Sequence, residues 1–137
     1  MRIVADTNVL VRVIVQDDPR QARTAQHTLK QAETIVVSLV SLCELVWALR
    51  YHYDYPRGDI AAAIRQLLTI GNLEIDLVGA NAGLAMLEAG GDFADGVIAY
   101  DGLRLGGETF VSFDRKAVTL LKDLGQSAHL LKEPAAK

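Results

Sequence analysis

Four acidic side chains occupy predicted strand ends and helix starts, the positions at which α/β proteins usually bind their ligands. Asp6 directly follows a short apolar, β-branched run, and Glu44 lies in the expected first turn of the helix after a second such run. Asp95 lies in the first turn of a helix after a Gly-Gly break, and Asp114 ends a late strand. In a parallel α/β sheet, the carboxyl ends of the strands and the helix starts that follow them share one edge. The sequence therefore predicts that these four carboxylates converge.

A pocket of four carboxylates needs a counter-charge, because like charges so close together cannot all stay ionised. No lysine or histidine accompanies these acids. The side chain of Arg115, which follows Asp114, could point towards the acids or away from them. Oxygen ligands without histidine or cysteine suit Mg²⁺ or Mn²⁺. Such an ion orients an attacking water, lowers its pKa and neutralises charge on a phosphoryl oxygen. The four acids are therefore candidate catalytic residues and metal ligands for phosphodiester hydrolysis.

Each acid taken alone has an ordinary structural explanation as a helix cap, a turn residue or a solvated surface residue. Helix N-termini favour anions in any case. Asp92, three residues before Asp95, is either a further ligand or the N-cap of that helix. A shared site is therefore indicated only by the joint placement of the acids at strand ends.

Alternating strand and helix patterns have to position these acids. The predicted strands lie around residues 3–4 and at 34–37, 73–77, 109–113 and 128–131. Between them are segments of helical periodicity, with Asp18 and Asp59 as expected N-caps and Pro19 as a first helical residue. This alternation predicts an α/β fold, a three-layer α/β/α domain with a mostly parallel central sheet of four or five strands.

The bulk properties restrict the class of protein. The 137 residues predict one domain over residues 1–132, followed by a frayed tail at 133–137. A single cysteine permits no internal disulfide, and neither a secretory signal nor a membrane span is evident, so we expect a cytoplasmic protein without a membrane partner. The net charge of −3 argues against a protein that coats nucleic acid through a basic surface, but a nuclease remains compatible with it.

The sequence resembles the PIN-domain family and, within it, the VapC-type toxin ribonucleases of type II toxin–antitoxin systems. The likeness covers nearly the whole chain. Its motifs, in chain order, are residues 6–12 (DTNVLVR), 17–19 (DDP), 41–45 (SLCEL), 92–99 (DFADGVIA) and 109–115 (TFVSFDR). Each motif is weak alone, and their order and spacing make the likeness specific. Gly96 departs from the pattern, since alanine is commoner at this position.

The resemblance implies a Mg²⁺- or Mn²⁺-dependent endoribonuclease with a PIN-like fold. It carries the metal-binding and catalytic roles over to Asp6, Glu44, Asp95 and Asp114. It also implies a homodimer and a small VapB-like antitoxin that inserts a basic residue into the acidic pocket. The RNA substrate would lie near this pocket.

Three further residues are candidates for contact with the substrate. Asn8 and Ser112 are polar neighbours of the predicted acids. Arg12 lies one turn beyond Asp6, where it could contact an RNA phosphate or the antitoxin, or form a salt bridge with Asp17 or Asp18.

Two other functions compete with the nuclease. A phosphatase of the haloacid-dehalogenase kind also uses an aspartate after its first strand, but it needs a second acid two residues later, where this chain has Asn8. Its catalytic lysine also has no well-placed counterpart. A non-catalytic PIN-like binding module is the other alternative, although the presence of all four acids argues against a degenerate site.

Overall fold

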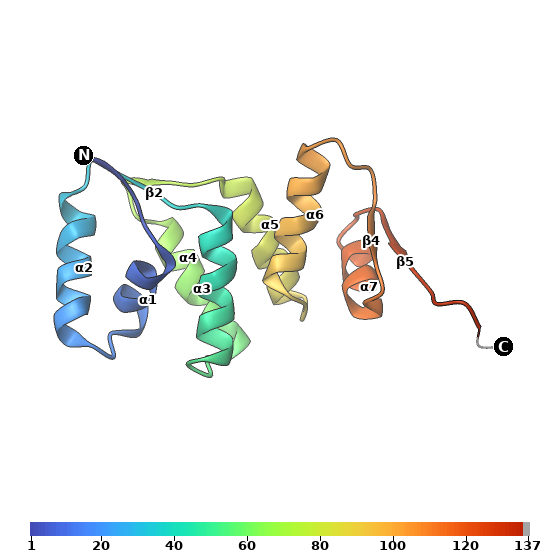
Figure 1. Cartoon of the computed structure of the whole chain (residues 1–137), viewed down its shortest axis with the longest axis horizontal. Helices are drawn as coiled ribbons and strands as arrows, with labels where there is room; N and C mark the ends of the chain where they lie inside the picture. Colours follow the sequence, from blue (N-terminus) through green and yellow to red (C-terminus); the bar gives the residue numbers. More distant parts are fainter. Residues whose placement is uncertain (136–137) are drawn as a thin grey trace. The chain divides into compact units, whose positions relative to one another are not determined.

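The computed structural model describes residues 1–135, and the chain divides into two compact units, Met1–Ala80 and Asn81–Lys137. Within the described residues there are five strands and seven helices, and every strand pairing is parallel (Figure 1). This confirms the predicted α/β class. The predicted domain extent of 1–132 stays a prediction, and the predicted frayed tail at 133–137 lies partly outside the described residues.

The first unit contains a three-stranded sheet in the order β1-β2-β3. Its elements are β1 (Arg2–Val4), α1 (Thr7–Val15), α2 (Pro19–Gln31), β2 (Thr34–Val36), α3 (Leu39–Tyr51), α4 (Arg57–Leu68) and β3 (Leu73–Glu74). The central strand pairs Ile35 with Ile3 on one side and Leu73 on the other. Ile35 is fully buried, as are the apolar stripes of α3 and α4. Burial of these β-branched and aliphatic side chains is the main force that stabilises the unit.

Several helix starts follow from local sequence. Asp18 caps α2, its carboxylate accepting a hydrogen bond from the Gln21 N–H at 3.1 Å, and Pro19 takes the first helical position, as predicted. The predicted cap Asp59 is wrong: α4 begins at Arg57 after Pro56, so Asp59 lies inside the first turn. The fixed φ of proline sets this start without a side-chain cap.

The helix that carries Glu44 also begins earlier than predicted. The Ser38 hydroxyl accepts a hydrogen bond from the Ser41 N–H at 3.1 Å, so Ser38 is the N-cap and α3 starts at Leu39. Glu44 is therefore the sixth residue of α3, in its second turn, and its predicted place in the first turn is wrong. The position remains close to the helix start, where a carboxylate can still reach the end of β1.

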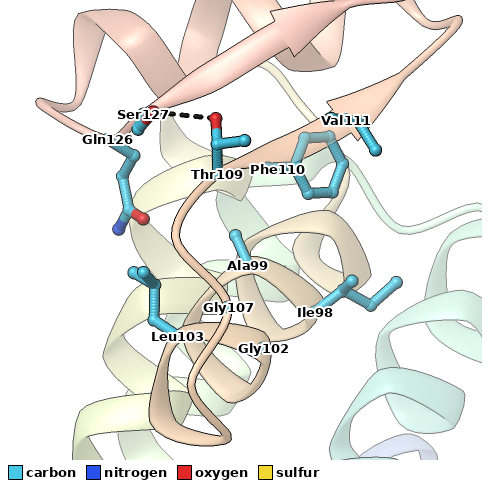
Figure 2. A pocket seen from close by; sticks show the side chains of 10 residues that line it. All are labelled: Ile98, Ala99, Gly102, Leu103, Gly107, Thr109, Phe110, Val111, Gln126 and Ser127. Atoms are coloured by element: carbon cyan, nitrogen blue, oxygen red, sulfur yellow. Dashed lines mark hydrogen bonds between the residues drawn. The ribbon is translucent and has the colours of Figure 1, made fainter.

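The second unit contains a two-stranded parallel sheet with helices packed on it. Its elements are α6 (Phe93–Arg104), β4 (Phe110–Ser112), α7 (Arg115–Asp123) and β5 (Ala128–Leu130), and α5 (Leu77–Glu88) runs across the division of the units. A pocket of about 250 Å³ lies between α6 and the β4–β5 strands (Figure 2). Ile98, Leu103 and Phe110 line it, and no acid of the described chain does. It is therefore separate from the predicted acidic site.

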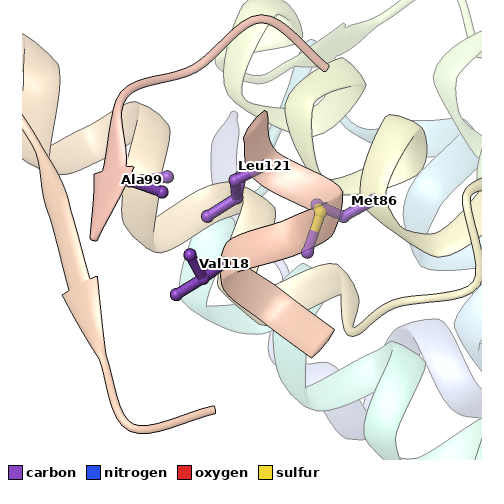
Figure 3. Packing of buried hydrophobic residues seen from close by; sticks show 5 residues of the cluster. Met86, Ala99, Val118 and Leu121 are labelled. Atoms are coloured by element: carbon purple, nitrogen blue, oxygen red, sulfur yellow. The ribbon is translucent and has the colours of Figure 1, made fainter. Parts of the chain in front are cut away.

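The core of this unit joins its helices to the sheet. Met86 from α5, Ala99 from α6 and Leu121 from α7 pack together with Val118 and Ala128 (Figure 3).

Strand β3 is shorter than predicted, because Asp76 accepts a hydrogen bond from the Gly79 N–H at 3.0 Å and so starts α5. No described helix combines the length and apolarity needed to cross a bilayer.

Helices α5 and α6 approach closely at Gly96. A Cβ atom added to Gly96 would lie 2.4 Å from the Ala82 carbonyl oxygen and 2.9 Å from the Met86 Cγ. Gly102, on the same helix, has no neighbour within 4 Å of such an atom. The departure from alanine at position 96 therefore has a packing reason.

Candidate metal centre

The first pair of predicted acids meets around Thr7. Asp6 is the N-cap of α1, and its carboxylate accepts a hydrogen bond from the Thr7 N–H at 2.9 Å. The Thr7 hydroxyl donates a hydrogen bond to Oε2 of Glu44 at 3.0 Å. Thr7 is buried, whereas Asp6 and Glu44 are exposed. One residue thus orients two acids that are far apart in the sequence and leaves an oxygen of each open to a ligand.

A change of Thr7 to valine should reduce activity without unfolding the chain. Valine keeps the buried volume and removes the hydroxyl, so Glu44 loses the donor that fixes its carboxylate. Loss of such a supporting hydrogen bond typically costs about 10- to 100-fold in metal affinity or activity. For the ribonuclease activity that the sequence resemblance implies, we expect the Thr7→Val variant to be about 10-fold slower than the wild type in an initial-rate assay, with its melting temperature as the check on folding.

Thr7→Ser serves as the matched control, because serine retains the hydroxyl and should retain most of the rate. If Thr7→Val cleaves as fast as Thr7→Ser, the bond to Glu44 has no role in the reaction.

The second group of acids gathers at the starts of α6 and α7. Asp92 is the N-cap of α6 and accepts a hydrogen bond from the Ala94 N–H at 3.0 Å. Asp114 is the N-cap of α7 and accepts one from the Ala117 N–H at 3.1 Å. Asp95 lies in the first turn of α6. The cap explanation raised for Asp92 is thus the one observed, and the same geometry applies to Asp114.

Asp95 has the least favourable electrostatic surroundings of this group. Partial burial raises the pKa of its carboxyl group, and the charges of Asp92 and then Asp114 raise it further. Its carboxylate accepts no hydrogen bond from any residue within 1–135. Arg115, at the start of α7, is exposed and forms no ion pair among those residues. Three carboxylates therefore lie near one another without a cation of the described chain to compensate them.

Comparison with known families identifies the chain. The model of the PIN domain matches residues 3–120. The chain belongs to the PIN-domain family. Among curated proteins, no sequence matches it. PIN domains are generally metal-dependent nucleases that act on nucleic acid, so the family supports a hydrolase of phosphodiester bonds and removes the dehalogenase-like phosphatase from consideration.

The donor chemistry of this PIN domain suits the divalent ions that the family typically binds. All the candidate ligands are carboxylates, and burial, with the added charges of Asp92 and Asp114, disfavours the ionised form of Asp95. Within residues 1–135, no group of three or more His, Cys, Asp or Glu side chains has the geometry of a metal site. The structure brings Asp6 together with Glu44, and Asp95 with Asp92 and Asp114, whereas convergence of all these acids stays a prediction.

The other predicted contact residues of the PIN domain have distinct surroundings. The Arg12 guanidinium donates a hydrogen bond to Asp17, which raises the pKa of Arg12 above its usual value. Of the alternatives for Arg12, the salt bridge is the one observed. Ser112 accepts a hydrogen bond from the Asp114 N–H at 2.9 Å and so supports that acid's backbone, while Asn8 is exposed on the first turn of α1.

The sequence motifs give no separate role to Thr7 or Arg20 of this PIN domain. Thr7 was treated only as part of a motif, although its position directly after Asp6 is a signal that its side chain lies near the same strand end. Arg20 belongs to none of the sequence motifs, yet it lines a groove with Asn8 and Arg12. No one-dimensional pattern distinguishes Arg20 from the exposed Arg23 on the same helix.

Proposed function

We propose that this PIN domain is a Mg²⁺- or Mn²⁺-dependent endoribonuclease. The observation that carries the proposal is the match to the PIN-domain family over residues 3–120, and the grouping of Asp92, Asp95 and Asp114 at the starts of α6 and α7 supports it. A divalent cation bound by these acids would relieve their mutual repulsion. The proposed ligands are Asp6, Glu44, Asp95 and Asp114.

The chain's own residues have separate roles in this proposal. Asp6 would hold the ion through its second carboxylate oxygen, since the first accepts a hydrogen bond from the Thr7 N–H. Glu44, also oriented by Thr7, either completes the ligand set of a second ion or accepts a proton from the attacking water. When bound, the ion supplies Lewis-acid stabilisation of the charge that develops on the phosphoryl oxygens.

We further propose that the enzyme acts as the toxin of a toxin–antitoxin pair and forms a homodimer in the cytoplasm. The support is the resemblance of the five sequence motifs to VapC-type ribonucleases. The partner would be a small VapB-like antitoxin that places a basic side chain near the acids. The reading frame directly upstream is where this partner is to be sought.

Removal of metal should abolish cleavage. We expect the purified protein to cut a labelled single-stranded RNA in Mn²⁺ or Mg²⁺, to lose this activity in excess EDTA and to regain it when Mn²⁺ is restored, because the acids alone offer no electrophile. Gel electrophoresis of the products measures the effect, and end-labelled fragments distinguish internal cuts from trimming.

Titration calorimetry with Mn²⁺ supplies the control. In the calorimetry, Mn²⁺ binding that does not depend on the carboxylates would contradict the proposed centre. In the cleavage assay, RNA that stays intact under all conditions would indicate a non-catalytic binding module. Cleavage that continues in EDTA would contradict the metal dependence.

A further inference from the structure

A groove of about 600 Å³ lies between α1 and α2 of the first unit. The two helices pack against each other (Figure 1). Side chains of Asn8 and Arg12 line it from α1, and those of Arg20, Gln21 and Thr28 line it from α2. All the charged residues of this lining are cationic, so the groove, which we call the α1–α2 groove, is suited to an anion.

Arg20 is the available cation of this groove. Arg12 already has a carboxylate partner in Asp17. Arg20 is exposed and forms no ion pair among residues 1–135. The side chains of Asn8, Gln21 and Thr28 likewise form no hydrogen bond within that range, so they offer further donors to a ligand. An unpaired guanidinium beside amide and hydroxyl donors is a typical arrangement for phosphate oxygens.

One end of α1 connects the groove lining to a candidate ligand, because Asn8 lies close in sequence to Asp6. Asn8 is the second residue of α1, in the turn that Asp6 caps. A strand that follows the groove from Arg20 towards Asn8 therefore arrives beside Asp6. Because the lining presents no large aromatic side chain for base stacking and no acid, the backbone of a nucleic acid suits it better than the bases.

We propose that the α1–α2 groove binds the phosphodiester backbone of single-stranded RNA, with Arg20 contacting a phosphate and Asn8 leading the strand to Asp6. This inference rests on the proposed ribonuclease function and names the path of its substrate. It assigns the residues of α2 to substrate binding and leaves the reaction itself to the acids. The contact is with phosphate, so the groove holds RNA without preference for sequence.

The test compares Arg20→Gln with Arg23→Gln, each combined with Asp95→Asn so that the RNA remains intact. Arg23 is exposed on the same helix but does not line the groove, so both changes remove one positive charge. Binding of a labelled single-stranded RNA is measured by fluorescence anisotropy over a range of salt concentrations. We expect Arg20→Gln to weaken binding about three- to tenfold and to reduce the slope of log K against log salt by about 0.7, the value of one phosphate contact. Arg23→Gln should change affinity less than about twofold.

Equal affinities and equal salt slopes for the two variants would overturn the inference. If the wild-type protein cleaves RNA while the variants bind alike, only the groove assignment fails. If the wild-type protein neither cleaves nor binds RNA, the proposed function fails and the inference with it. Binding of an oligoglutamate peptide tests the alternative anion. If Arg20→Gln weakens binding of the peptide but leaves RNA binding unchanged, the groove is a site for an acidic protein segment and the inference is wrong.

Discussion

Asp95→Asn is expected to abolish RNA cleavage while making the folded protein more stable at neutral pH. Asparagine preserves the shape of the side chain but removes the charge that would bind the metal. Loss of one preorganised charge-stabilising group typically costs about 100- to 1,000-fold in rate, and we expect at least about 100-fold here. An initial-rate assay in Mn²⁺ measures this loss.

The gain in stability follows from the raised pKa of Asp95. Its pKa is higher in the folded state than the unfolded value of 3.8, because burial and the charges of Asp92 and Asp114 disfavour ionisation. The folded state therefore binds the proton more tightly, and stability falls as pH rises from the unfolded pKa through the folded one. Above this range the charged carboxylate destabilises the fold, and asparagine removes that cost.

Thermal unfolding over a range of pH checks the second half of this prediction. The melting temperature of Asp95→Asn should exceed that of the wild type at pH 7 without metal, and the difference should disappear below the unfolded pKa. Glu108→Gln is the matched control, because it removes one exposed negative charge from the same unit. A variant that loses activity and also unfolds more easily would show a structural role for Asp95 instead.

Gly96→Ala is expected to have the largest effect on stability. The added Cβ would meet the Ala82 carbonyl oxygen at 2.4 Å, and this neighbour is backbone that cannot rotate away. Overpacking of this kind costs about 1–3 kcal/mol or more, which exceeds the gain of about 1 kcal/mol from replacing a helical glycine by alanine. We expect a net loss of about 2 kcal/mol, measured by urea unfolding.

Gly102→Ala on the same helix should have the opposite sign. Its added Cβ meets nothing within 4 Å, so only the helix propensity changes and stability rises by up to about 1 kcal/mol. Two destabilised variants would indicate that α6 tolerates no added side chain, and two stabilised variants would contradict the close approach of α5 and α6.

The fold was largely predictable because its signals are local. Apolar β-branched runs identified the strands, and the Asp18–Pro19 pair identified the start of α2. The error at Glu44 arises because several polar residues near a helix start can cap it, and the packed chain selects the hydrogen bond to Ser38. The error at Asp59 has another cause, because the fixed φ of Pro56 starts the helix earlier without a side-chain cap.

The candidate site was predictable only in part. Residue type and position relative to strand ends indicated the acids. The bond from Thr7 to Glu44 joins residues 37 positions apart and depends on strand register and helix rotation. The role of Arg20 depends on the shape of a surface, which no sequence period encodes. Patterns therefore found the chemical groups but not the contacts that orient them.

Three of the acids that would bind the metal or lie beside it also begin helices: Asp6 caps α1, Asp92 caps α6 and Asp114 caps α7. Replacement of a capping aspartate by alanine costs about 1 kcal/mol, whereas asparagine caps as well as aspartate. Most random losses of activity at these positions would thus also yield a less stable chain that cellular proteases remove sooner. Genes for inactive variants that persist over many generations should therefore encode asparagine or serine at these three positions more often than alanine.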